Sequence, residues 1–166
     1  MTGTFRHWPL PLLLVVSLSA SARDIPKELW GKWRVTRILP TKTISCWSDK
    51  EAKLLLGTEI EFAAHLLRWQ TTEASHIDTE VREVTAEQFE AQNSSPSASG
   101  SQVNFRQLGI RVTEVRQILI NHDDAKITGA TTEIPGDDVL IKGKNTIVFP
   151  VCNVYFEAKR ISTTSR

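Results

Sequence analysis

The sequence predicts a mainly antiparallel all-β domain of about eight strands, with one or two short helices. Short runs of β-branched and aromatic residues recur at close spacing along most of the chain. Turn sequences such as Pro135-Gly136 and Gly143-Lys144-Asn145 separate several of these runs. Only two stretches have the composition of a helix, so the pattern favours a barrel or a sandwich.

The first 22 residues have the order of a secretory signal peptide. Arg6 and His7 precede an apolar run from Leu10 to Leu18, and small residues end at Ala22, after which we expect cleavage. The alternative is a membrane anchor, but the run is roughly nine residues long where a bilayer needs ~20. We expect a secreted or periplasmic protein without a membrane span, in which residues 23–166 form a single domain.

The charge of the chain argues against a nucleic acid as its partner. The sequence has 20 Lys and Arg residues and 19 Asp and Glu residues, and removal of Arg6 with the signal peptide makes these totals equal. Nucleic acids and anionic membranes select clusters of basic residues. The sequence contains no such cluster.

The two cysteines, Cys46 and Cys152, predict a disulfide bond. An even number of cysteines in an exported protein most simply forms a bridge, and the alternative is a pair of buried free thiols. A bridge that closes a loop of about 100 residues stabilises by up to ~4.7 kcal/mol in the chain-entropy model. We expect it to tie the beginning of the fold to the last strand.

The first third of the domain predicts a strand followed by a helix. Residues 31–39 are rich in Trp, Val and Ile and end at Pro40, which is typical of a strand. Ser48 and Glu51 have the spacing of a capping box, and Gly57 is suited to the end of the helix that they begin. We expect this helix to have about two turns.

A hairpin and a further strand follow. Ile60 and Phe62 alternate with glutamates, and Leu67 and Trp69 lie in the next run, so we expect these four side chains on one inner face. Residues 77–85 predict another strand, with a helical turn that begins at Thr85. The polar residues 93–102 predict a loop within the domain, and Asn93-Ser94-Ser95 matches an N-glycosylation sequence.

The last third gives the clearest β signal. Residues 112–120 predict a long strand, residues 139–149 a hairpin around Gly143-Lys144-Asn145, and residues 151–161 the final strand. Glu114 and Arg116 share one face of the first of these strands. They lie either in the interior as a polar pair or, as is more common, on the solvated face, with Val115, Gln117 and Leu119 inward.

The two ends of the domain are expected to meet. Alternation directs Trp33 inward at the head of the first strand, and Gly31 before it allows the backbone to bend sharply. The same alternation places Phe156 and Arg160 on the inner face of the last strand. If the first and last strands pair, the Arg160 guanidinium lies on the indole of Trp33, which closes one end of the barrel.

Gly31-Lys32-Trp33 on the first strand, with Arg160 on the last, resembles the G-x-W and closing-arginine signature of the lipocalin-like (calycin) barrels. This resemblance implies an eight-stranded lipocalin-like barrel with Gly31, Trp33 and Arg160 in structural roles. The chain differs from the lipocalin pattern because the second half has no T-D-Y stretch and because a helix with Cys46 follows the first strand.

Candidates for catalysis are few. His76 and Asp78, and His122 with Asp123 and Asp124, place imidazoles beside carboxylates, as a zinc or acid–base site would. Both groups are expected in loops or at strand ends, where solvated turn residues are the ordinary explanation. No G-x-S-x-G or similar nucleophile context is present. We therefore expect no catalytic residue, metal or cofactor.

Two functions remain. The first is a barrel that binds an apolar or amphipathic small molecule inside, with an interior lined by five residues: Trp33, Phe62, Leu67, Trp69 and Phe156. The second is an exported protein-binding module, such as an inhibitor of a hydrolase. A hollow interior would favour the first function and a filled one the second.

Overall fold

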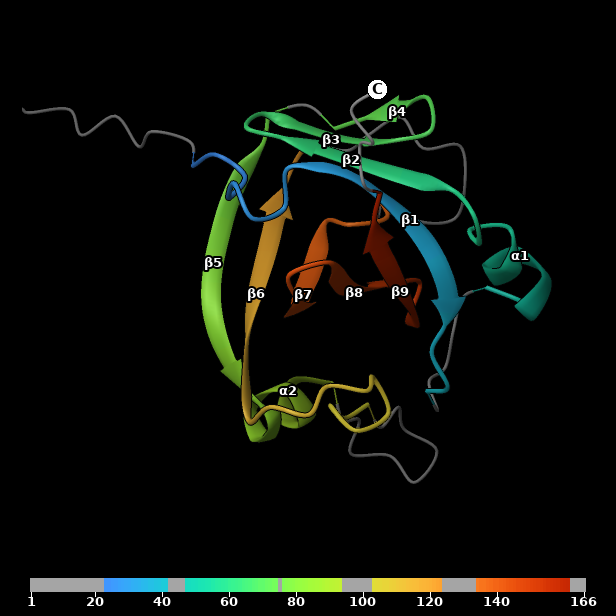
Figure 1. The fold of residues 1–166 in the computed structure, drawn as a ribbon, viewed down its shortest axis with the longest axis vertical. Helices are drawn as coiled ribbons and strands as arrows, with labels where there is room; N and C mark the ends of the chain where they lie inside the picture. Colours follow the sequence, from blue (N-terminus) through green and yellow to red (C-terminus); the bar gives the residue numbers. More distant parts are fainter. Residues whose placement is uncertain (1–22, 42–46, 75, 94–102, 124–133, 162–166) are drawn as a thin grey trace, which may run out of the picture.

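The computed structural model describes residues 23–41, 47–74, 76–93, 103–123 and 134–161, which form a barrel-like, mainly antiparallel β-fold (Figure 1). This confirms the predicted fold class. Nine strands are described: β1 (Gly31–Ile38), β2 (Glu59–Ala63), β3 (Leu66–Trp69), β4 (Thr72–Glu73), β5 (Asp78–Thr85), β6 (Glu114–Asn121), β7 (Asp138–Gly143), β8 (Thr146–Val151) and β9 (Val154–Arg160).

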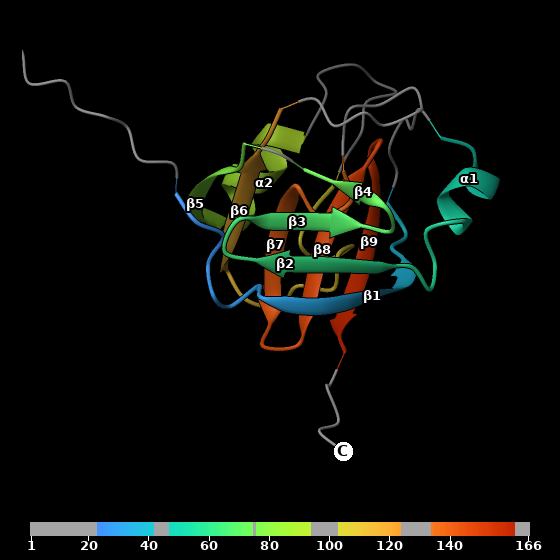
Figure 2. The same cartoon turned by 90° about the horizontal axis from the view of Figure 1, so that it is seen from above.

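The strands form one sheet in the order β4-β3-β2-β1-β9-β8-β7-β6-β5. The sheet curls strongly, so that β1, β2 and β3 cross in front of β7, β8 and β9 in the view from above (Figure 2). β1 lies between β2 and β9, and Trp33 is opposite Ile60 on one side and Arg160 on the other. The first and last strands therefore pair, as expected.

Two short helices flank the sheet. α1 (Asp49–Lys53) begins at Ser48, whose hydroxyl and backbone N–H form the predicted capping box with Glu51. It projects from the body of the molecule in both views (Figures 1 and 2). α2 (Ala86–Asn93) is longer than the single turn predicted, and Thr85 and Gln88 form reciprocal hydrogen bonds at its start. No helix in the described ranges is both long and apolar enough to cross a bilayer.

Both faces of the sheet carry buried side chains, because successive residues of a strand point to opposite faces. The inner face contributes Trp33, Phe62 and Phe156 to the main core. The outer face of β6–β9 carries a second cluster that α2 and residues 103–110 cover; its members are Leu39, Val84, Phe89, Val103, Phe105, Leu108, Ile110, Val115, Leu140, Val148 and Tyr155. This second cluster explains why much of the last third of the sequence is apolar on both strand faces.

Of the two orientations that the sequence left open for β6, the structure shows the less common one, with Arg116 on the inner face. Ile118 and Ile120 belong to the inner core, so alternation puts Arg116 on their face and Val115 and Gln117 on the outer one. Val115 belongs to the outer cluster and Gln117 is buried. The outer positions are apolar because residues 103–110 shield them from water, rather than because they face the barrel interior.

The final strand also begins later than predicted. Cys152 and Asn153 both have positive φ, of 52° and 63°, and they form the tight turn between β8 and β9. The predicted strand over residues 151–161 is therefore the end of β8, this turn and β9. Cys152 is buried, whereas Cys46 lies outside the described residues, so the bridge between them stays a prediction.

Residues 23–30 cross from the edge of β5 to the start of β1 (Figures 1 and 2). The backbone N–H of Arg23 donates to Asp78 Oδ1 at 2.9 Å, and Thr79 N–H donates to the Arg23 carbonyl at 3.2 Å. Farther along, Ile25 N–H donates to the carbonyl of Ala64 in the β2–β3 turn at 2.9 Å. This segment therefore links the two halves of the curled sheet.

Candidate functional site

The five side chains predicted to line a ligand cavity meet in the inner core. Phe62, Leu67 and Phe156 join Trp33 there, and Trp69 packs against them from the edge, partly buried. Leu67 and Phe156 are 0% exposed, and Trp33 and Phe62 are 1% and 2% exposed. Almost no water-sized space adjoins Phe62, Leu67 and Phe156, so these three side chains pack against protein atoms.

Two further contacts fill the interior around Phe62 and Phe156. The Phe149 and Phe156 rings stack with centroids 5.6 Å apart. Gly136, at the centre of the predicted Pro135-Gly136 turn, faces Phe62 so closely that an added methyl group would lie 2.8 Å from the Cζ atom of that ring. The interior around Phe62 and Phe156 is therefore filled by side chains rather than hollow.

The closed end of the barrel is built around Arg160. Its Cζ atom lies 4.1 Å from the centroid of the Trp33 ring, and its two terminal nitrogens donate to the carbonyls of Trp30 and Glu28. The indole N–H of Trp33 donates to the Leu29 carbonyl at 2.7 Å. Burial lowers the pKa of Arg160 from its ordinary value. The predicted contact is thus present, and it also fixes residues 28–30 against the sheet.

A cleft of about 580 Å³ opens beside this arrangement. It lies between residues 27–28, the turn from β7 to β8, and the Trp33–Arg160 pair; its lining is Lys27, Glu28, Trp33, Ile141, Gly143, Lys144, Asn145 and Arg160. Ile141 provides partly exposed apolar surface, Trp33 reaches the cleft only with the edge left by its 1% exposure, and Lys27, Lys144 and Arg160 provide positive charge. Of the five predicted ligand residues, only Trp33 lines it.

The carboxylate of Glu28 pairs with an arginine that does not line this cleft. Its Oε2 atom accepts a hydrogen bond from Arg116 Nη1 at 2.7 Å, and Arg116 Nε also lies 3.4 Å from Glu83. Glu28 therefore neutralises Arg116 on β6. Arg116 lies on the inner face of β6, which was one of the two orientations considered from the sequence. Its ion-pair partners are Glu28 and Glu83 rather than Glu114.

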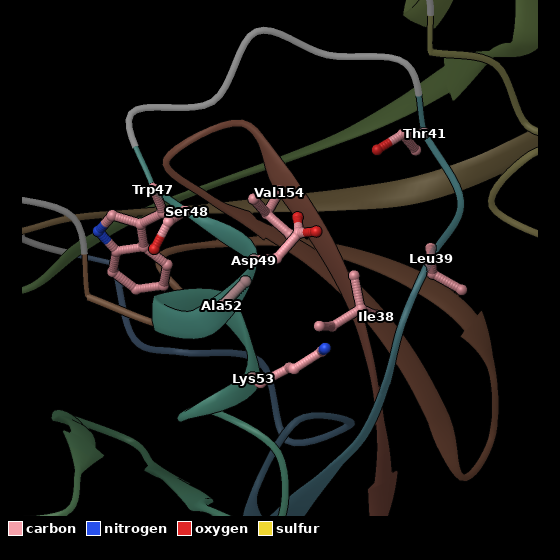
Figure 3. A pocket seen from close by; sticks show the side chains of 9 residues that line it. All are labelled: Ile38, Leu39, Thr41, Trp47, Ser48, Asp49, Ala52, Lys53 and Val154. Atoms are coloured by element: carbon pink, nitrogen blue, oxygen red, sulfur yellow. The ribbon is translucent and has the colours of Figure 1, made fainter.

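A second cleft, of about 330 Å³, separates α1 from β1 and the start of β9 (Figure 3). Trp47 lies on one side of it, and Leu39 and Thr41 lie on the other; its complete lining is Ile38, Leu39, Thr41, Trp47, Ser48, Asp49, Ala52, Lys53 and Val154. Just beyond α1, Leu54 and Leu56 are 70% and 40% exposed. The projecting helix thus combines a cleft with exposed leucines.

The histidine-containing motifs come together in the fold. His76 Nδ1 lies 2.5 Å from Asp123 Oδ2, and both side chains are exposed. His122 Nε2 lies 3.6 Å from Asp137 Oδ2. Asp78 instead accepts a hydrogen bond from the backbone N–H of Arg23. Asp124 lies outside the described residues. Among the residues that the structure describes, no group of three or more His, Cys, Asp or Glu side chains is placed to hold a metal ion.

The outer face holds a buried ion cluster that the sequence did not predict. Glu157 on β9 is only 7% exposed and accepts hydrogen bonds from Lys142 at 2.6 Å and Arg37 at 2.9 Å. Burial of the carboxyl opposes its ionisation, but the hydrogen bonds from Lys142 and Arg37 outweigh burial and keep the pKa of Glu157 below its ordinary value. Lys142 also donates to the Leu108 carbonyl at 3.0 Å, so the cluster anchors the covering segment.

Asn93 of the possible glycosylation sequence has a structural role in α2. Its Nδ2 donates to the Phe89 carbonyl at 2.8 Å, and its Oδ1 accepts from the Tyr155 hydroxyl at 2.8 Å. A sugar attached to Nδ2 would replace one of its two hydrogens, so it would share this nitrogen with the hydrogen bond to Phe89.

Comparisons of the chain with protein-family models, curated proteins and solved structures find no significant match.

Proposed function

We propose that this chain is an exported binding protein that holds an amphipathic small molecule in the cleft beside Trp33, outside the barrel. The observation that carries the proposal is the composition of this cleft, in which the partly exposed side chain of Ile141 lies beside a rim with three cations. Its volume of about 580 Å³ falls in the range of small-molecule sites, which is roughly 300–1,000 Å³.

Export and membership in the lipocalin-like barrels are parts of the same proposal. Export is supported by the order of residues 1–22. Membership is supported by the Gly31-Lys32-Trp33 stretch, the pairing of Trp33 with Arg160 and the curled antiparallel sheet. The filled surroundings of Phe62 and Phe156 count against a ligand inside the barrel, where a lipocalin-like barrel would hold it. The proposed small-molecule site is therefore the cleft at the closed end.

The test is titration of the mature protein with the neutral lipophilic dye Nile red. Dye emission should rise saturably, and Gly143→Trp should abolish this rise. Gly143 lines the cleft, and a Cβ atom added there meets no atom within 4 Å, so this position can carry a large side chain toward the cleft. Lys159→Trp, at an exposed position outside the cleft, is the matched control. Absence of saturable binding, or equal binding by both variants, would contradict the proposal.

A protein-binding module is the second candidate, and the exposed leucines beside α1 favour it. A helix that projects with Leu54 and Leu56 in solvent, next to the cleft of Figure 3, is suited to contact another protein. If this module is an inhibitor of a hydrolase, the protein should inhibit at least one enzyme in a panel of secreted hydrolases. Leu54→Asp should relieve that inhibition without a change in melting temperature, and Val112→Asp, at another exposed apolar position, should not.

A further inference from the structure

We infer that the cleft beside Trp33 selects an amphipath with an anionic head group, which Lys27 and Lys144 bind while its apolar part contacts Ile141. This inference rests on the proposed function and specifies the chemical class of the ligand. Its basis is the imbalance of charge in the lining, where three cationic side chains accompany one carboxylate.

The single carboxylate is already paired. Glu28 binds Arg116, which does not line the cleft, so little of its negative charge offsets Lys27 and Lys144. None of the ion pairs within the described ranges involves either lysine. Both lysines are exposed, and the Lys27 ammonium lies 5.7 Å from the Trp30 ring centroid.

Arg160 has a positioning role in this site. Its guanidinium is occupied by the carbonyls of Trp30 and Glu28 and by the Trp33 ring. It therefore contributes fixed positive charge behind the cleft, whereas the lysines have the free hydrogen-bond donors that an anion needs. A neutral head group can accept a hydrogen bond from these lysines but lacks the charge attraction, and a cationic head group is repelled.

The experiment is displacement of Nile red from the mature protein by three amphipaths with the same chain: decanoate, decanol and decyltrimethylammonium. Decanoate should compete about tenfold better than decanol, and decyltrimethylammonium should compete worst. The advantage of decanoate should shrink as salt rises, because charges on an exposed rim are screened. In Lys27→Gln/Lys144→Gln the advantage should fall to about twofold or less, whereas Lys159→Gln, outside the cleft, should leave it unchanged.

The outcomes separate the inference from the proposed function. Equal competition by decanoate and decanol, or an advantage that survives in the double variant, would overturn the anionic specificity while Nile red binding still supports the cleft. Loss of Nile red binding in the wild-type protein would overturn the proposed function itself. Because Lys27 contacts Trp30, the single variant Lys144→Gln serves as a check, and it should lose part of the decanoate advantage at an unchanged melting temperature.

Discussion

Arg160 at the end of β9 covers the indole ring of Trp33 near the start of β1, with its Cζ atom 4.1 Å from the ring centroid. The pair joins the first and last strands, and its hydrogen bonds also hold residues 28–30 in place. The closed end of the barrel is therefore one cooperative unit.

This unit predicts non-additive mutational effects. Trp33→Ala should lower the free energy of unfolding by ~3–5 kcal/mol because it removes a buried aromatic side chain, and Arg160→Ala should lower it less. The double variant should lose less than the sum of the two losses, since both single changes remove the same contact. Urea unfolding of the four proteins measures the coupling, and Trp30→Ala, at a partly buried position, should cost less than Trp33→Ala. Strict additivity would contradict the shared contact.

The contact between Gly136 and Phe62 predicts different costs at two glycines. Both Gly136 and Gly57 have positive φ, of 97° and 83°, so replacement by Ala strains the backbone by roughly 1–2 kcal/mol at either site. Only at Gly136 does the new methyl group meet Phe62; no atom lies within 4 Å at Gly57. Gly136→Ala should therefore lose about 1–3 kcal/mol more than Gly57→Ala in thermal or urea unfolding. Equal losses would show that the interior beside Phe62 can accept further atoms.

The ion cluster of Glu157 predicts a loss of stability in acid. Because the folded-state pKa of Glu157 lies below its ordinary value, its contribution is present above the unfolded-state pKa of about 4.3 and disappears as pH falls through the folded-state pKa. Glu157→Gln should cost about 1.5–3 kcal/mol at pH 7. The difference between the two proteins should narrow in unfolding measurements below about pH 4. A difference that stays constant in acid would contradict this role.

The hydrogen bond from Arg23 to Asp78 predicts an effect of signal-peptide removal. Cleavage after Ala22 would turn the backbone nitrogen of Arg23 into an α-ammonium group, 2.9 Å from the carboxylate if the contact is kept. Asp78→Asn should then lower the stability of the mature protein by about 0.2–1 kcal/mol, and less in a form with an acetylated N-terminus. Asp24→Asn is the neighbouring control. Mass spectrometry of the exported protein checks the premise, since its first residue should be Arg23.

The predicted bridge between Cys46 and Cys152 can be measured directly. Non-reducing peptide mapping of the exported protein should yield one cross-linked peptide, and replacement of either cysteine should lower the melting temperature because the unfolded chain gains freedom. Two alkylatable thiols in the native protein would contradict the bridge.

The sequence predicted those elements that bury one face or carry a specific start signal. β1 alternates clearly around Trp33 and Val35, and α1 has its capping box, so both could be placed. β4 has only two residues, too few for any periodicity to be visible. The orientation of β6 could not be decided because both of its faces are buried over Gln117–Ile118, and a strand of that kind has no polar face to mark the solvent side.

The site was less predictable than the fold. Trp33 and Arg160 could be paired because they lie on strands that the barrel brings together. Lys27, Gly143 and Lys144 come from a turn and a hairpin end, where no periodicity relates one residue to another. The partners of Glu157 were equally hidden, since Arg37 and Lys142 come from two other strands, far from Glu157 or from each other in the sequence.

The contact of Arg160 with the Trp30 carbonyl spans 130 positions of the sequence, and it has a consequence for how the protein folds. One of the two strands that pair with β1 is β9, the last described strand, so this pairing can form only after β9 has been synthesised. Pairings between such distant segments slow folding because a large loop must close first. Until then β1 has an unpaired edge, which exposes the nascent chain to aggregation. The sheet is therefore complete only after the C-terminal strand has been synthesised.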